Sequence, residues 1–263
     1  SQKVNAQTRA QHAAGEYDNG IIQLNQNESA RGPGPNTMEA IRAHTTRRVG
    51  RGYSPDHVNE LREGIANYYG LSTANVELAT GSTPLLQGSV RAFCDAEKAF
   101  VTPMPTYSTS LSTAREIDAR AIELSLDSGL GVDLDTLAAN ASGAGLLYLC
   151  NPNNPTGTVH GPQVVERFVR RVMRENPDTY VHIDEAYINY CRPGAIETAV
   201  PLAMEFEKVF ITRSFSKAHG MAGLRVGYAL GQEQTLEKIR NAWGMGDVNM
   251  LAAVAALTAL EDK

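Results

Sequence analysis

The sequence lacks the features of disulfide-rich, zinc-binding and membrane-spanning proteins. Its 263 residues include only three cysteines, Cys94, Cys150 and Cys191, and none of them forms a C-x-x-C pair. This spacing indicates neither a disulfide framework nor a zinc site, so we expect buried thiols and predict no metal site. The longest apolar stretch, from Met250 to Leu260, is an alanine-rich segment too short to cross a bilayer.

The sequence also has no excess of positive charge. Lysine and arginine total 24 against 29 aspartates and glutamates, which gives a formal net charge of -5. A nucleic-acid-binding surface is therefore not expected. With 42% hydrophobic and 20% charged residues, the chain is long enough to bury one large core. We expect a cytoplasmic protein; because the sequence begins at Ser1 instead of Met, an exported form after signal removal is the alternative.

Short apolar runs alternate with helical patterns over most of the chain. Residues 1 to about 50 are polar and predict an arm with a helix at 37–44, and Ser54 followed by Pro55 predicts a helix that ends near Gly70. Beyond it we predict strands at 76–80, 99–103, 145–150, 180–184, 208–213 and 227–230, and helices at 83–94, 106–117, 162–174 and 232–242. This alternation is typical of a three-layer α/β/α fold with a mostly parallel sheet, in which ligands bind at the carboxyl ends of the strands.

The first motif at a strand end is "TGST", residues 80–83. It ends a strand and opens a helix, so Gly81 frees the backbone while Ser82 and Thr83 present N–H and hydroxyl groups at the positive end of the helix. A phosphate fits such a site. An ordinary turn with a helix cap is the alternative interpretation.

A carboxylate and a lysine follow two later strands. Asp184 in "YVHIDEAY" ends an apolar run, where a carboxylate is costly to bury unless it meets a cation; a helix cap or a structural salt bridge are the alternatives. Lys217 in "SFSKAHGMAGLRVG" lies 33 residues further on. With Arg213 and Arg225 nearby and a partly dry pocket around it, its ammonium group should lose its proton readily and become a nucleophile.

These elements together predict one cofactor. An aldehyde that carries a phosphate and a pyridine nitrogen needs an amine, an anion site and a carboxylate at once. Pyridoxal phosphate has this chemistry. Single histidines in strands and loops are more often structural, so we assign no function to His160 and His182.

Three segments resemble those of the fold-type I, class I and II pyridoxal-phosphate aminotransferases: "NPNNPTG" (151–157), "DEAY" (184–187) and "SFSKAHGMAGLRVG" (214–227). Within that family, "LNQNESARGPGP" (24–35) and "RGYSPD" (51–56) are similar to segments of the histidinol-phosphate aminotransferase group. The resemblance extends from about Ile22 to Lys263, and the motifs are jointly specific. It implies transfer of an amino group between an amino acid or amino phosphate and a 2-oxo acid.

The resemblance also implies a role for each matching residue. Lys217 would form a Schiff base with the cofactor and later move the proton at the substrate Cα, while Asp184 would keep the pyridine nitrogen protonated. Asn154 and Tyr187 would bond the cofactor's phenolic oxygen, and Tyr107 would stack on its ring. The phosphate would be held by Ser214, Ser216, Arg225, the backbone of Ser82 and Thr83, and Tyr53 from a second subunit. A homodimer is therefore expected.

The chain departs from the family pattern at both ends. The arm reads "ESARGPGP" where relatives commonly have an Asn-Pro segment, so Asn27 and Arg31 are our candidate substrate residues, and Arg31 can grip an anionic group with two hydrogen bonds. In the family, the arginine that binds the substrate α-carboxylate usually lies in a C-terminal small domain, which we expect to be missing here. We predict an arm at 1–50, a large cofactor-binding domain at 51–245, and the start of the interdomain helix at 246–263.

Two other functions have similar motifs. One is a decarboxylase of the threonine-phosphate type, which differs from an aminotransferase by releasing carbon dioxide. The other is a non-catalytic pyridoxal-phosphate-binding module of the kind fused to transcription regulators, which would need a DNA-binding partner domain.

Overall fold

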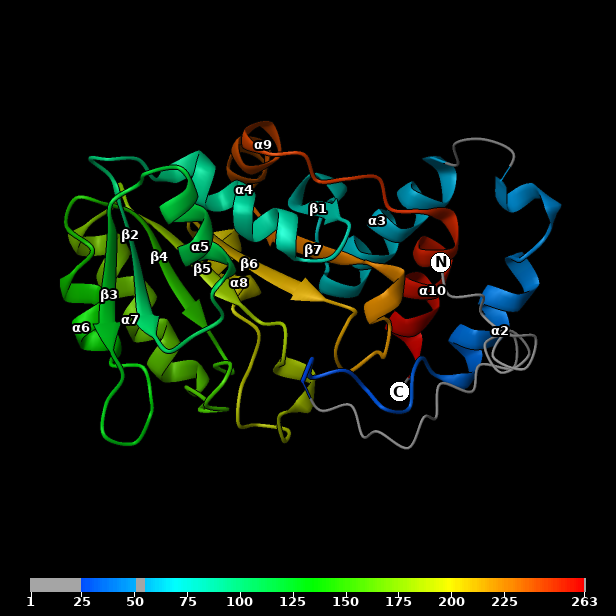
Figure 1. Ribbon diagram of the computed structural model, residues 1–263, viewed down its shortest axis with the longest axis horizontal. Coiled ribbons are helices and arrows are strands. Elements are labelled where there is room, and N and C mark those ends of the chain that lie inside the picture. Colours follow the sequence, from blue (N-terminus) through cyan, green and yellow to red (C-terminus); the bar gives the residue numbers. More distant parts are fainter. Residues whose placement is uncertain (1–24, 51–54, 263) are drawn as a thin grey trace, which may run out of the picture.

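The computed structural model describes residues 25–50 and 55–262 (Figure 1). Within them, the chain forms a seven-stranded sheet in the order β1-β7-β6-β5-β4-β2-β3. Strand β7 is antiparallel to its neighbours β1 and β6, and the other pairs are parallel. The strands are β1 (Val76–Ala79), β2 (Ala99–Met104), β3 (Ala121–Ser125), β4 (Ala144–Cys150), β5 (Tyr180–Asp184), β6 (Val209–Ser214) and β7 (Gly227–Gly231). The predicted α/β fold with a mostly parallel sheet is confirmed.

Helices cover both faces of this sheet. The α-helices are α2 (Pro35–His44), α3 (Pro55–Tyr69), α4 (Thr83–Phe93), α5 (Thr109–Glu116), α6 (Leu134–Ala139), α7 (Pro162–Glu175), α8 (Val200–Glu205), α9 (Glu233–Ala242) and α10 (Met250–Glu261). Helices α4, α5 and α9 share one hydrophobic core with one face of the sheet, and α3, α6, α7, α8 and α10 share a second core with the other face. Over the described residues, every helix is too short or too polar for a transmembrane span.

The central strands are buried on both faces, which explains their nearly continuous apolar sequences. In β4, Leu146, Tyr148 and Cys150 belong to the core under α4, α5 and α9, whereas Leu147 and Leu149 belong to the opposite core. All five side chains are almost fully buried. Successive side chains of a strand point to opposite faces, so a parallel strand covered by helices on both sides needs apolar residues at nearly every position.

The last described helix, α10, packs against α2 and α3 on the β1 side of the sheet (Figure 1). It begins at the Asn249 side chain, which accepts a hydrogen bond from the Ala252 N–H at 2.9 Å. At its other end, Asp262 accepts hydrogen bonds from the Thr37 hydroxyl at 3.0 Å and the Thr37 N–H at 3.3 Å. The Asn36 side chain also donates to Asp262 and is the largest cause of the lowered pKa of this carboxyl group, and the two Thr37 bonds add to the effect. The end of α10 is thereby tied to the first turn of α2.

The predicted elements occur where the sequence places them, with shifted ends. The helix expected at 106–117 spans Thr109–Glu116, and the one expected at 37–44 begins two residues earlier, at Pro35. Strand β3 and the six-residue helices α6 and α8 are absent from the prediction. The proposed division into an arm, a large domain and an interdomain helix stays a prediction.

Candidate active site

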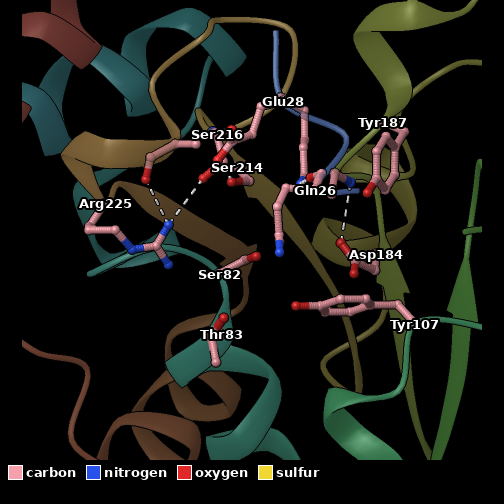
Figure 2. A pocket seen from close by; sticks show the side chains of 13 residues that line it. Gln26, Glu28, Ser82, Thr83, Tyr107, Asp184, Tyr187, Ser214, Ser216 and Arg225 are labelled. Carbon is pink, nitrogen blue, oxygen red and sulfur yellow. Dashed lines mark hydrogen bonds between the residues drawn. The ribbon is translucent and has the colours of Figure 1, made fainter. Parts of the chain in front are cut away.

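The residues that follow β1, β2, β5 and β6 surround a cavity of about 250 Å³ (Figure 2). Two further wall residues, Gln26 and Glu28, come from the N-terminal segment. The remaining wall consists of Ser82, Thr83, Tyr107, Asp184, Ala186, Tyr187, Ser214, Ser216, Lys217, Ala222 and Arg225. The structure therefore brings most of the predicted site residues to one place at the carboxyl edge of the sheet, as expected for a sheet of this kind.

Asp184 is the most deeply buried acidic group of this cavity. Its side chain ends β5, is 2% exposed, and accepts hydrogen bonds from the Tyr148 hydroxyl at 2.9 Å, the Thr212 hydroxyl at 3.1 Å and the Ala186 N–H at 3.2 Å. Burial raises the pKa of Asp184, and the three hydrogen bonds oppose this rise. In the described part of the chain no basic side chain pairs with it. A cation inside the cavity would therefore stabilise its ionised form.

Lys217 lies in the segment after β6, the strand next to β5. Its ammonium group donates to the Gln26 carbonyl at 2.8 Å and lies 5.7 Å from the centre of the Tyr187 ring. The pKa of Lys217 is lowered, first by burial and then by the charge of Arg225, while Glu28 and Asp184 act in the opposite direction. A larger share of this amine is thus neutral than for an exposed lysine.

The second predicted cation near Lys217 is directed elsewhere. Arg213 donates to Glu185 at 2.9 Å, and both side chains are largely buried, with 12% and 2% exposure. Its guanidinium also lies 5.4 Å from the centre of the Tyr69 ring. The expectation that Arg213 helps to deprotonate Lys217 is wrong, because Arg213 is paired with Glu185, does not line the cavity and is not among the charges that shift the pKa of Lys217.

Hydroxyl groups, the start of α4 and one guanidinium form an anion cradle opposite Asp184. Figure 2 shows Arg225, Ser216 and Ser82 on one side of the cavity and Asp184 and Tyr107 on the other. The Arg225 guanidinium is 3.5 Å from the Ser216 hydroxyl and donates to the Ala222 carbonyl at 3.0 Å. Because α4 begins at Thr83, its unpaired N–H groups add positive charge to this side.

Gly81 does not line the cavity but makes room for the cradle. Its φ of +82° lies in the left-handed region, and a Cβ atom there would collide with the guanidinium of Arg225. The left-handed φ favours glycine, and a side chain here would force the Arg225 guanidinium to shift away from its place in the cradle. Arg225 itself has a φ of 60°, so it adopts the left-handed conformation without being glycine.

Tyr187 carries a phenolic oxygen between two amide groups. It accepts a hydrogen bond from Asn154 at 3.2 Å and one from Asn27 at 3.2 Å. Burial raises the pKa of Tyr187, and the bond from Asn27 opposes this. The predicted substrate residue Asn27 thus contacts the edge of the site through Tyr187.

A second cavity, of about 560 Å³, adjoins the first at Glu28 and Tyr187. Its wall combines apolar and aromatic groups with a few polar ones: Asn27, Pro152, Asn153, Asn154, Pro155, Gly157, Val159, Tyr190, Cys191, Arg192 and Ala195. A molecule bound in the first cavity can therefore extend past Tyr187 into this space.

Two predicted residues do not join the others. Arg31 is exposed and lines neither cavity. Tyr53 lies outside the described residues.

Sequence reasoning missed several residues of the site. Gln26 and Glu28 reach it from nearly 200 positions away in the chain, and no local pattern indicated this contact. Tyr148 and Thr212 lie within apolar strands, where their hydroxyl groups were the available signal.

Comparison with known proteins gives consistent matches. The model of the family "Aminotransferase class I and II" matches residues 19–263. Histidinol-phosphate aminotransferase 1 of Bradyrhizobium diazoefficiens is 32% identical over 247 residues, which are 93% of this chain and 67% of that protein. An aromatic amino acid aminotransferase of Nocardia farcinica is 33% identical over 254 residues, covering 95% and 70%. This chain thus spans about two thirds of the length of these relatives.

Solved structures share the fold. A histidinol-phosphate aminotransferase of Sinorhizobium meliloti, in complex with pyridoxal-5'-phosphate, aligns with a TM-score of 0.79 and 30% identity, over 90% of this chain and 63% of that one. An L-threonine-O-3-phosphate decarboxylase of Porphyromonas gingivalis aligns with a TM-score of 0.71 and 21% identity, over 87% and 69%. The latter similarity shows the fold alone.

Proposed function

Because this chain belongs to the aminotransferase class I and II family, we propose that its protein is a pyridoxal-phosphate-dependent aminotransferase that moves an amino group from a donor amine to a 2-oxo acid. One observation carries the proposal furthest. The cavity holds the buried carboxylate of Asp184, which has no basic partner among the described residues. The anion cradle at Arg225 lies on the opposite side, and the amine of Lys217 also lines the cavity.

The residues of the cavity fit this cofactor. Its phosphate matches Ser82, Thr83, Ser214, Ser216 and Arg225, all of which line the cavity. A side chain at position 81 would fill part of the cradle, which is an observation independent of any family motif. Asp184 and its three donors match a protonated ring nitrogen, since a cation inside the cavity would offset the burial of the carboxylate.

Each residue then has a specific task. Pyridoxal phosphate, when bound, supplies an aldehyde for amines and a ring that withdraws electrons from the carbon attached to the amino group. Lys217, with its lowered pKa, would hold the cofactor's aldehyde through its neutral amine, and the same amine would carry the proton to and from the substrate Cα. Asp184 would hold the proton on the ring nitrogen. Tyr187 and Asn154 would orient the phenolic oxygen, and Tyr107 would pack against the ring.

We propose that the donor carries a ring on its side chain. The relatives include histidinol-phosphate and aromatic amino acid aminotransferases, and the second cavity offers apolar and aromatic walls beside Tyr187. Asn27 would orient this part of the donor through Tyr187. Arg31 stays a weaker substrate candidate, because it is exposed and lines neither cavity.

A panel of amino donors tests the proposal. The protein loaded with pyridoxal phosphate would be mixed with histidinol phosphate, phenylalanine, tyrosine or aspartate without an acceptor, and the loss of the cofactor's absorbance would be followed. We expect the ring-bearing donors to react and to yield the corresponding oxo compound. Release of carbon dioxide from the donor would instead favour the decarboxylase, and cofactor binding without any reaction would favour the non-catalytic module.

We also propose a homodimer in which Tyr53 reaches the phosphate of the neighbouring subunit. The proposal rests on the similarity of "RGYSPD" to the family's turn. Light scattering on the cofactor-loaded protein should give twice the mass of one chain, and a monomer at micromolar concentration would contradict it.

A further inference from the structure

Three neighbouring strands place four buried polar side chains together beneath the site. In the sheet register Asp184 of β5 lies opposite Thr212 of β6, and His182, two residues earlier in β5, lies opposite Tyr148 of β4. Because residues two apart in a strand share a face, His182 and Asp184 point to the same side of the sheet. None of the four side chains is more than 2% exposed.

Their hydrogen bonds run in one direction. An ionised carboxylate only accepts, so the Thr212 hydroxyl, 3.1 Å from Asp184, uses its proton for that bond. The His182 Nε2 atom lies 2.8 Å from the same hydroxyl oxygen, so when Asp184 is ionised Nε2 is the donor. This order places the histidine proton on Nε2 and leaves Nδ1 unprotonated, which agrees with Nδ1 having no hydrogen-bond partner within the described part of the chain.

His182 also packs against the second donor to Asp184. Its ring meets the Tyr148 ring edge-on, with 5.3 Å between centroids, and stacks on Phe210 at 4.5 Å. One buried histidine thus contacts both side chains whose hydroxyl groups bond the carboxylate. The unpaired Nδ1 atom of His182 costs free energy because it is buried, and an apolar side chain in its place would avoid this cost. The bond from Nε2 to Thr212 is the contribution that an apolar side chain could not make.

Resting on the proposed function, we propose that His182, Thr212 and Tyr148 are positioning residues that hold Asp184 ionised and correctly oriented, and through it keep the cofactor's ring nitrogen protonated. Three donors occupy part of the acceptor capacity of the carboxylate and leave the rest for a cation in the cavity. His182 acts on Asp184 through Thr212 and touches neither cofactor nor substrate.

Besides Tyr148, other titratable groups lie around Asp184. They are Cys150 on β4, Glu185 and Tyr187 after β5, and Lys217 after β6. Burial raises the pKa of the Cys150 thiol and of Tyr187, so both stay neutral near neutral pH. Burial lowers the pKa of His182 to about 3, so this ring does not titrate in the working range.

The test compares Thr212→Val, which removes the hydroxyl at nearly constant volume, with Thr212→Ser, which restores it. The first readout uses protein without cofactor: nitrogen NMR of the ¹⁵N-labelled His182 ring. We expect the proton on Nε2 from pH 5 to 9 in the parent protein and in Thr212→Ser. In Thr212→Val the proton should move between the two nitrogens, because the acceptor of Nε2–H is gone.

The second readout is the pH dependence of the amino-donor half-reaction in the loaded protein. Loss of a donor raises the pKa of Asp184, so the acid limb should move upward by about one pH unit in Thr212→Val and in Tyr148→Phe. Thr212→Ser should return it toward the parent value.

A Thr212→Val profile and His182 spectrum identical to the parent would overturn the proposal, as would a Thr212→Ser variant that behaves like Thr212→Val. A parent protein that binds cofactor but transfers no amino group would overturn the proposed function instead. In that case the NMR readout still decides whether the His182–Thr212–Asp184 order exists.

Discussion

Gly81 leaves free the space that the guanidinium group of Arg225 occupies, although the two residues are 144 positions apart in the sequence. Gly81 follows β1 and Arg225 precedes β7, and these two strands are paired in the sheet. The anion cradle is therefore built by strand pairing between distant parts of the chain.

Replacing Gly81 with alanine should weaken binding of pyridoxal phosphate by roughly ten- to a hundredfold, because the new methyl group displaces Arg225, whose guanidinium would bind the phosphate. An absorbance titration measures this. Gly70→Ala is the matched control: Gly70 has a similar φ of +68°, but nothing lies within 4 Å of its added Cβ. The control should lose stability from backbone strain and keep its cofactor affinity. Equal loss of affinity in both variants would contradict the cradle.

Borohydride reduction of the loaded protein should fix the cofactor on Lys217. Peptide mass spectrometry identifies the modified lysine, and Lys217→Ala should remove the adduct. Lys208→Ala is the control, because Lys208 precedes β6, at the opposite end of that strand, and pairs with Asp178 at 2.8 Å. An adduct on any other lysine of the parent protein would contradict the assignment.

Asp184→Asn should separate cofactor binding from chemistry. The amide keeps the shape of the carboxylate and loses its charge, so the ring nitrogen is no longer held protonated. Attachment to Lys217 needs only the amine and should persist, whereas the amino-donor half-reaction should slow by roughly a hundred- to a thousandfold. Stopped-flow absorbance measures both steps. Asp178→Asn, on the exposed surface, should react like the parent, and near-normal turnover of Asp184→Asn would refute the role.

The sequence was sufficient to predict the elements that consist of long regular patterns. Central strands such as β4 and β5 are continuous apolar runs because both of their faces are buried, and helix α7 repeats its buried residues Val165, Phe168, Val169 and Val172 at helical spacing. The elements that were not predicted lack such patterns. Strand β3 lies at the sheet edge with no residue fully buried, and helices α6 and α8 are too short to show a helical repeat of apolar residues.

The site was predictable where its residues follow strand ends, and it was not where strand register decides. Arg213 and Arg225 look equivalent in the sequence as cations near Lys217. In the folded chain, Arg213 pairs with Glu185, whereas Arg225 lines the cavity. The sequence does not show in which direction each side chain points. The donors Tyr148 and Thr212 depend in the same way on the alignment of β4 and β6 with β5.

The neighbouring acid Glu185 should matter for stability more than for chemistry. Glu185 is 2% exposed, pairs with Arg213 and accepts a 2.7 Å bond from the Ala199 N–H. Glu185→Ala removes the carboxylate partner of a buried guanidinium and should lower the free energy of unfolding by about 3–5 kcal/mol. Glu205→Ala breaks an exposed pair with Arg170 and should change stability little. Urea unfolding measures the free energy of unfolding of both variants. Equal losses of stability in Glu185→Ala and Glu205→Ala would contradict a structural role of Glu185 that depends on its burial.

Glu28 should set the pH at which Lys217 captures the cofactor. The neutral amine is the reactive form, and the negative charge of Glu28 raises the pKa of Lys217 against the lowering caused by burial and by Arg225. Glu28→Gln removes the opposing charge, so the pKa should fall further and the rate of covalent capture should reach its plateau at a lower pH. Arg225→Gln removes a cation that favours the neutral amine, so its profile should move to higher pH.

Stopped-flow absorbance at saturating cofactor from pH 6 to 10 separates this shift from weaker phosphate binding. Glu63→Gln, on α3 outside the cavity wall, serves as the control for a change of net charge. Shifts of Glu28→Gln and Arg225→Gln in the same direction would show that these two charges do not tune Lys217.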